Sequence, residues 1–181
     1  MTEPGVVAVS ARKGHRFSKQ PQLAIILVAG RGVAGDGHFG EMVQHRSRKR
    51  LRPDLPNMRQ VHLIAEELLG ELRAQGFALG PGDMGENILT RGLDLIALPL
   101  GTRLQLGADA MIELTGLRNP CVQMDRFMSG LMQAALGRDE AGALVRKAGV
   151  MGIVLRGGEV HAGDAIACTL PDGPPEPLRP V

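Results

Sequence analysis

Aromatic residues are nearly absent from this sequence. Its 181 residues include four Phe but neither Trp nor Tyr. A hydrophobic core must therefore consist mainly of Leu, Ile, Val, Met and Ala side chains. Proteins that hold single-stranded nucleic acid stack the bases on aromatic side chains, so this composition disfavours a nucleic-acid-binding surface of that kind.

Cysteines are equally few. The sequence has two, Cys121 and Cys168, which excludes the disulfide framework of a small secreted domain. The longest apolar run, residues 23–29, is far shorter than the ~20 residues needed to cross a bilayer. The N-terminus also lacks the basic-then-apolar pattern of a secretory signal. We therefore expect a cytoplasmic protein without a membrane partner.

Net charge is small as well. The formal charge of +2 is too low to indicate a polyanionic partner through bulk electrostatics. Hydrophobic residues make up 44% and charged residues 22% of the chain, which is typical of a globular protein. Length and composition predict a single domain over residues 1–170, followed by a Pro-rich tail, residues 171–181, that we expect to be disordered or extended.

Short apolar segments separated by turns predict a mainly β fold with a few peripheral helices. Residues 100–112 and 157–166 resemble each other, since each reads as turn, strand, turn and strand, and this pattern suits a closed or nearly closed β-barrel. Residues 22–29 are apolar nearly throughout, which predicts a strand buried on both faces. Further strands are expected at residues 5–12, 59–64, 88–90, 111–115, 150–155 and 164–170, and helical spacing occurs at residues 65–75 and 125–136.

Cys121 ends a stretch, residues 115–121, that passes from a strand into a turn. Pro120 keeps Asn119 out of helical geometry, so the thiol is expected in a loop rather than inside a strand. Arg118 and a following helix would lower the pKa of the thiol and favour the thiolate, the form that attacks electrophiles and binds metals. The same residue fits a second interpretation, a small buried hydrophobic side chain.

Two glycine-rich turns carry polar side chains. Residues 30–40 place Asp36 and His38 in a loop whose backbone is able to approach a ligand, although a wide flexible turn explains the glycines equally well. No Gly-Lys-Ser/Thr closes this loop, so it is not a phosphate-binding P-loop. The second turn ends in Glu86 and Asn87 at a strand entrance, where they either bind a ligand or cap the turn.

A basic run follows the first of these turns, with five Lys or Arg side chains between residues 45 and 52. Such runs are usually solvated, mobile loops. A phosphate group or an acidic partner is the alternative interpretation.

Five segments, taken in order, are distinctive. They are GDGHFG (residues 35–40) with His45, RQV (59–61), GDMGEN (82–87), RNPC (118–121) and GEVHAGD (158–164). Their order and spacing resemble the MOSC domain, which occurs at the C-terminus of molybdenum-cofactor sulfurases. The resemblance covers nearly the whole chain.

The resemblance implies a β-barrel that binds the molybdenum cofactor, Mo-molybdopterin, with Cys121 as molybdenum ligand or as sulfur carrier. In sulfurases a separate N-terminal domain uses pyridoxal phosphate to extract sulfur from cysteine, and neither that domain nor pyridoxal phosphate is expected in this chain. The sequence is similar instead to stand-alone bacterial members, some of which reduce N-hydroxylated bases. Reduction would need an external electron-transfer reductase as partner, and sulfur carriage would need a cysteine desulfurase; a homo-oligomer is compatible with both.

The chemistry of the cofactor assigns roles to residues. Molybdenum on a pterin dithiolene with a phosphate needs a soft thiolate for the metal, cations for the phosphate and polar groups for the pterin. Cys121 provides the thiolate. A zinc site fits less well, because two distant cysteines and scattered histidines lack its ligand spacing. The residues that we assign to the cofactor are Asp36, His38, His45, Arg59, Glu86, Asn87, Arg91, Arg118 and Asn119.

Two other functions stay open. The first is a persulfide carrier or cofactor-delivery module without turnover of its own. The second is a non-catalytic, nucleic-acid-binding barrel that uses the basic run, which a salt-sensitive gel shift would reveal. Whether the protein is an enzyme is therefore left open by the sequence.

Overall fold

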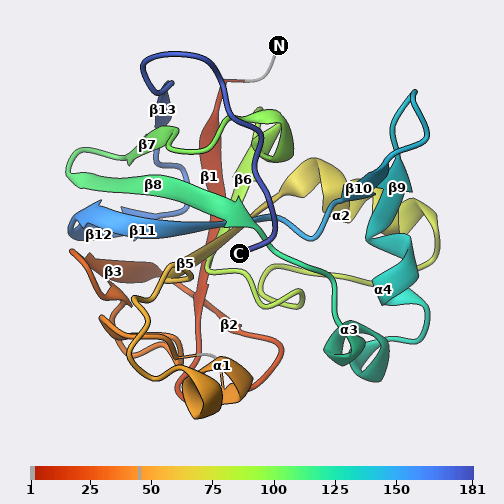
Figure 1. The fold of residues 1–181 in the computed structure, drawn as a ribbon, viewed down its shortest axis with the longest axis horizontal. Coiled ribbons are helices and arrows are strands. Elements are labelled where there is room, and N and C mark those ends of the chain that lie inside the picture. Colours follow the sequence, from red (N-terminus) through yellow and green to blue (C-terminus); the bar gives the residue numbers. More distant parts are fainter. Residues whose placement is uncertain (1–2, 45) are drawn as a thin grey trace.

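The structure is a computed structural model that describes residues 3–44 and 46–181, with only the backbone described at residues 46–48. It is mainly β, as predicted (Figure 1). One sheet has the strand order β13-β7-β8-β11-β5-β6-β1-β2, and its neighbours are antiparallel except for the parallel pair of β5 and β6. Its strands are β1 (Gly5–Ala11), β2 (Gln20–Gln22), β5 (Val61–Ala65), β6 (Ile88–Arg91), β7 (Arg103–Leu106), β8 (Ala110–Leu117), β11 (Val150–Arg156) and β13 (Ile166–Thr169).

Two small sheets and a few helices complete the fold. The small sheets are β12 (Gly158–His161) with β3 (Ala24–Val28) and β4 (Gly32–Val33), and β9 (Leu136–Arg138) with β10 (Leu144–Arg146). The helices are α1 (Arg46–Leu51), α2 (Glu66–Ala74), α3 (Val122–Phe127), α4 (Leu131–Ala134) and the 3₁₀ turn η1 (Leu95–Ala97). In the part of the chain that the structure describes, no helix is long and apolar enough to cross a bilayer.

Two hydrophobic clusters lie on opposite faces of the large sheet. In β5 the side chain of Leu63 joins one cluster and that of Ile64 the other, and Ile88 and Leu89 of β6 divide in the same way. Successive side chains of a strand point to opposite faces, which explains this division. The small sheet of β3 and β12 covers the first face, and α2, α3 and α4 cover the second. The central strands are thus buried on both sides and form a rigid base for the loops at their ends.

The predicted closed barrel is not found. Among the described residues β13 and β2 are the edges of the sheet, and no ladder joins them. The sheet nevertheless curls until the start of β1 meets the residues just before β13, through a bridge between Gly5 and Ala165 and a 2.8 Å hydrogen bond from the N–H of Val6 to the carbonyl of Asp164. Residues 100–112 and 157–166, which resemble each other in sequence, differ in structure. The strand β12 of the second segment pairs with β3 and not with a strand of the large sheet.

The strand predicted to be buried on both faces, residues 22–29, is β3 and is buried on one face only. Ile25 and Leu27 are buried, whereas Ile26 between them is 56% exposed and Leu23 is exposed. β3 belongs to a small sheet that packs on the core with one side, so its outer side chains meet solvent. An apolar sequence alone could not distinguish these arrangements.

Helical spacing at residues 125–136 predicted one helix, but the structure has two short ones. α3 ends at Phe127, and Gly130, with φ of 83°, precedes α4. A left-handed residue interrupts an α-helix, and glycine adopts that conformation readily. The basic run, expected as a loop, contains the short helix α1.

The Pro-rich tail, residues 171–181, makes backbone hydrogen bonds with the rest of the chain. Prolines lack an N–H, but the carbonyls of the tail accept hydrogen bonds: Glu176 from the N–H of Leu100, and Arg179 from the N–H of Leu117, both at 2.8 Å. Leu178 is only 7% exposed and joins the first hydrophobic cluster. In Figure 1 the tail runs to the C-terminus beside the end of β8. The segment that carries Cys121 directly follows β8.

Candidate functional site

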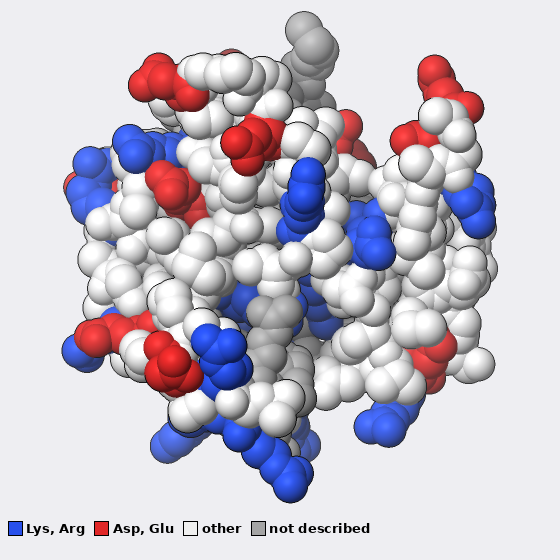
Figure 2. Space-filling view, viewed as in Figure 1, with Lys and Arg blue, Asp and Glu red and all other residues white. Residues whose placement is uncertain are grey.

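A cleft of about 250 Å³ lies where several loops at the ends of the central strands converge. The loop before β2 lines it with Arg16, Phe17 and Lys19, and the segment after β8 lines it with Arg118, Asn119 and Cys121. Lys and Arg side chains are visible in the hollow between the surface over α1 and the surface over α3 (Figure 2). The other lining residues are His38, Arg59, His62, Gly85, Asn87, Gln123 and Met151.

A larger hollow, of about 390 Å³, lies elsewhere, between α2 and the residues around η1. Its described lining residues include neither cysteine nor histidine, and Glu71 among them forms an ion pair with Lys147 at 2.7 Å. The cleft that holds the thiol is therefore the better candidate for chemistry, although it is smaller.

Cys121 lies in a loop, as the sequence predicted, and not within a strand. It is the residue before α3, with an extended backbone at φ −138° and ψ 164°, and its carbonyl accepts a 2.9 Å hydrogen bond from the N–H of Met124. The residue is partly exposed. Its thiol is thus accessible from the cleft, in contrast to a buried core cysteine.

Arg118 fixes the start of the Cys121 segment. Its N–H donates to the carbonyl of Gly149 at 2.9 Å, its Nη1 donates to the carbonyl of Met84, and its guanidinium carbon lies 5.3 Å from the centre of the Phe17 ring. Burial lowers the pKa of Arg118, while the negative charges of Cys121 and Glu86 oppose that change. A guanidinium remains charged in proteins, so Arg118 brings a poorly hydrated cation close to the thiol.

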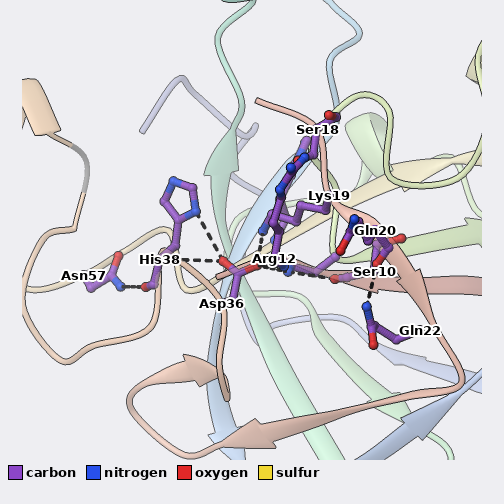
Figure 3. Close-up of polar contacts among 11 residues, drawn as sticks. Ser10, Arg12, Ser18, Lys19, Gln20, Gln22, Asp36, His38 and Asn57 are labelled. Carbon is purple, nitrogen blue, oxygen red and sulfur yellow. Dashed lines mark hydrogen bonds and ion pairs between the residues drawn. The ribbon is translucent and has the colours of Figure 1, made fainter. Parts of the chain in front are cut away.

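Asp36 is the centre of a polar network beside the cleft (Figure 3). Its Oδ2 lies 2.9 Å from Lys19 Nζ and accepts hydrogen bonds from the N–H of Arg12 and from Asn87 Nδ2. Its Oδ1 accepts the N–H of His38 at 3.0 Å and lies 3.3 Å from His38 Nδ1. Asp36 therefore orients the ring of His38, which lines the cleft.

The charges in this network depend on one another. Burial by itself would raise the pKa of Asp36, but the hydrogen bond from His38 and the charge of Lys19 outweigh it and hold that pKa well below its ordinary value. Burial lowers the pKa of Lys19, against the attraction of Asp36. The direct 2.9 Å contact identifies the two residues as a buried ion pair.

Glu86 lies just behind the cleft rather than in its wall. The residue is 1% exposed; its Oε1 accepts the N–H of Gly82, and its Oε2 is buried without a hydrogen-bond partner among the described residues. Burial raises the pKa of Glu86 to about 7, although the hydrogen bond from Gly82 and the charges of Arg118 and Lys19 oppose the rise. At neutral pH this carboxyl is therefore able to take up or release a proton.

His62 is a cleft residue that the sequence did not single out for function. It is buried in β5, and its Nε2 lies 2.8 Å from the carbonyl of Ala148. Burial and the charge of Arg118 lower the pKa of His62. A neutral imidazole that donates to this carbonyl follows from both observations.

The structure brings eight of the predicted site residues together and separates one of them, Arg91, from the site. His38, Arg59, Asn87, Arg118, Asn119 and Cys121 line the cleft, with Asp36 and Glu86 behind them. Arg91 does not reach the cleft, because it is exposed at the far end of β6, opposite Gly5 of β1. The predicted contact by His45 lies outside the described residues.

Two further predicted cofactor residues, Asn87 and Asn119, also have structural partners. Asn87 donates from Nδ2 to the carbonyl of Ser10 and to Asp36, and its Oδ1 accepts the N–H of His62, so its side chain ties three segments together. Asn119 Oδ1 accepts a 2.9 Å hydrogen bond from Arg146 Nε. The cleft residues that sequence analysis missed are Arg16, Phe17, Lys19, His62, Gln123 and Met151. The basic character of residues 13–19 was a signal for the first three of them.

Comparisons with known proteins agree with this fold. The family model of the MOSC domain matches residues 35–167, which is most of the chain. The structure of the YuaD protein from Bacillus subtilis is similar, with a TM-score of 0.75 and 23% identity over 91% of this chain and 94% of that one. YiiM from Geobacillus stearothermophilus has a TM-score of 0.64 and 17% identity over 92% of this chain and 75% of that one.

YiiM from Escherichia coli is similar to a lesser degree, with a TM-score of 0.58 and 19% identity over 97% of this chain and 74% of that one. At these identities the solved structures support the fold alone. A comparison with curated proteins gave no match. The family model covers the segments that carry His38, Asn87 and Cys121. By that match, this chain belongs to the MOSC domain family.

Proposed function

We propose that the chain binds the molybdenum cofactor in the cleft, with Cys121 as the protein's ligand to molybdenum. The observation that carries the proposal is a lone, accessible thiol in a cleft with four cationic side chains, Arg16, Lys19, Arg59 and Arg118. No acidic side chain is among the described residues that line this cleft. Such a donor set fits a soft metal whose ligand also carries a negatively charged group.

The residues also argue against an ordinary metal site. Within the described part of the chain, no group of three or more His, Cys, Asp or Glu side chains is placed to hold a metal ion. A metal held by Cys121 would therefore need most of its ligands from another molecule. The dithiolene of the molybdenum cofactor supplies such ligands, and its phosphate would contact the cleft cations.

Each residue of the site has a role that follows from its contacts. Arg118 places a positive charge near the thiol of Cys121, and Asp36 orients the ring of His38 at the edge of the cleft. Phe17 and Met151 reduce the access of water. The bound cofactor would supply a metal that accepts and donates two electrons. Reduction of an N-hydroxylated substrate would consume those electrons, delivered by an external reductase, together with two protons.

Substitution of Cys121 tests the proposal directly. Cys121→Ser should abolish retention of molybdenum in protein expressed in a host that makes the cofactor, while the fold stays intact. Cys168→Ala is the matched control, because Cys168 is exposed on β13 and outside the cleft, and it should retain the metal. Elemental analysis, pterin fluorescence and circular dichroism measure these outcomes. Equal molybdenum content in both folded variants would refute the role of Cys121.

Sulfur carriage is a second candidate function, favoured by the partial exposure of Cys121 in a loop beside Arg118. The Cys121 thiolate would attack the outer sulfur of a persulfide on the desulfurase, and the desulfurase cysteine would leave as a thiolate. Intact-mass measurement after incubation with a desulfurase and cysteine should then show the gain of one sulfur atom on wild-type protein and on Cys168→Ala. The absence of that gain in both proteins would exclude sulfur carriage.

A further inference from the structure

A second, apolar pocket adjoins the cleft. It has a volume of about 140 Å³ and shares two residues, His38 and Arg59, with the cleft. The two hollows therefore meet at these side chains. The remaining residues of the apolar pocket are Val43, Leu55, Pro56, Asn57 and Met58.

The walls of the apolar pocket are held in place by hydrogen bonds. The segments before and after α1 pair with each other, since the N–H of Val43 donates to the carbonyl of Leu55 and the N–H of Asn57 donates to that of Glu41, both at 2.9 Å. A β-bridge between Met42 and Pro56 lies between these bonds. The pocket is thus largely preformed, and a ligand would not have to order it.

Asn57 joins the apolar pocket to the edge of the cleft. Its Nδ2 donates to the carbonyls of His38 and Gly40 at 2.9 Å, and its Oδ1 accepts the N–H of Arg59 at 3.1 Å. Figure 3 shows Asn57 and His38 on the side of Asp36 opposite Lys19. Both amide protons of Asn57 are used within the protein, so this polar side chain presents no N–H donor to a ligand.

The chemistry of the walls selects what can enter. Val43 is buried, and Leu55 and Met58 are 36% and 38% exposed, so apolar side chains extend from the floor of the pocket to its surface. Apart from Asn57, whose amide protons are used within the protein, the polar side chains among the described lining residues are His38 and Arg59, at the boundary with the cleft. A molecule that spans both hollows would therefore place its polar end toward Cys121 and an uncharged, apolar part among these side chains.

We propose that this apolar pocket is a substrate subsite that binds one ring-sized apolar group of the molecule whose polar end reacts in the cleft. Its volume of about 140 Å³ is close to that of an apolar cavity of ~150 Å³ known to hold one benzene molecule. The identity of the reacting end rests on the proposed function. The subsite itself depends only on the geometry of this chain.

A pair of ligands tests the subsite without activity or bound cofactor. N-benzylhydroxylamine and N-methylhydroxylamine share the polar end, but only the first carries a ring. Wild-type protein should bind the benzyl compound more tightly by roughly tenfold or more, which is the gain expected from burying one phenyl ring. Isothermal calorimetry and ligand-observed NMR, run on cofactor-free protein, measure both affinities.

Substitutions at Leu55 locate the binding. Leu55→Trp narrows the subsite, and Leu55→Asp places a carboxylate at its mouth, so each should abolish the preference for the benzyl compound while binding of the methyl compound stays within about twofold. The chain has no Trp or Tyr, so Trp fluorescence of the first variant reports on this position alone. Leu144→Trp is the matched control, because Leu144 is also a partly exposed leucine but lies on β10, away from α1 in Figure 1.

Two results would overturn the subsite. One is equal affinity of wild-type protein for the two compounds, or no measurable binding of either. The other is a preference that both folded Leu55 variants retain. A protein that never holds molybdenum but prefers the benzyl compound, and loses that preference in the Leu55 variants, would refute the cofactor proposal and leave the subsite intact.

Discussion

Glu86 is a buried carboxyl whose pKa is raised by burial from 4.5 to about 7. An acid with a raised pKa in the folded state contributes stability below its unfolded pKa and loses that contribution as the pH rises through its folded pKa. Glu86→Gln removes this titration. The variant should therefore be more stable than wild type above pH ~7, by up to roughly 3 kcal/mol.

Urea denaturation between about pH 5 and pH 8 measures this effect. The free energy of unfolding should decline with pH in the wild type and decline less in Glu86→Gln. Parallel pH dependence in the two proteins would show that Glu86 does not titrate in this range.

Lys19 and Asp36 form a buried ion pair at 2.9 Å, and each residue is only 7% exposed. Removal of one partner leaves an uncompensated buried charge, which typically costs 3–5 kcal/mol. Lys19→Met should therefore destabilise the protein by about 3 kcal/mol. The double variant Lys19→Met/Asp36→Asn should recover much of that loss. Chemical denaturation measures the free energy of unfolding of each variant. A loss in the double variant equal to the sum of the losses in the two single variants would contradict a direct pairing.

Only some of the residues at the cleft could be predicted from the sequence. Asp36, His38 and Cys121 were singled out in the sequence because glycine- and proline-rich turns present them in loops, a property of neighbouring sequence. Lys19 and His62 were missed because their roles depend on contacts with segments that are distant in the sequence, such as Asp36 and the carbonyl of Ala148. A lysine in a basic loop carries no local sign that it will be buried.

At the scale of elements, the turn before β11 places Gly149 against β5. Its φ is +93°, and a Cβ added there would overlap the carbonyl of Leu63 and lie 2.9 Å from His62 Nε2. Gly149 also accepts the N–H of Arg118, so this turn supports the cleft. Gly149→Ala should destabilise the protein by ~3 kcal/mol or more, from strain and overlap together.

Gly163 provides a matched control for this prediction. Its φ is +94°, yet a Cβ there would meet nothing within 4 Å. Gly163→Ala should therefore show only the cost of the left-handed conformation, about 1 kcal/mol. Thermal or urea unfolding of both variants separates the cost of the left-handed conformation from the cost of the overlap with β5. Equal losses of stability in the two variants would mean that the overlap with β5 adds nothing.

Most strands were predicted near their observed bounds, because alternation of side chains and turn residues are local properties. The exceptions have tertiary causes. β3 lies on a one-sided small sheet, so its apolar sequence did not imply burial on both faces. The helical pattern at residues 125–136 continues through Gly130, but the chain turns there to begin α4.

At the scale of the whole molecule, the tail connects stability to the site. Removal of residues 174–181 would expose the surface covered by Leu178 and delete the two hydrogen bonds of Leu117, the residue before Arg118. The truncated protein should lose about 2 kcal/mol of unfolding free energy from the leucine alone. It should also retain less molybdenum, because the segment leading to Cys121 would be less ordered.

The point variant Leu178→Ala separates the loss of the buried leucine side chain from the loss of the backbone hydrogen bonds, because it removes the side chain and keeps the hydrogen bonds. Leu170→Ala, at an exposed leucine just before the tail, is the control and should be neutral. Urea denaturation and metal analysis of the three proteins test the prediction. A truncated protein as stable as wild type would show that the tail only lies on the surface.

The sequence by itself determined the β class of the fold, the position of most strands and the presentation of Cys121 in a loop, because these depend on neighbouring residues. The tertiary structure decided that the sheet curls without a closing ladder, that Arg91 lies far from the cleft, and that Lys19 pairs with Asp36. It also created the apolar pocket from segments on both sides of α1. Strand order and long-range packing bring such residues together, and no local pattern encodes either of them.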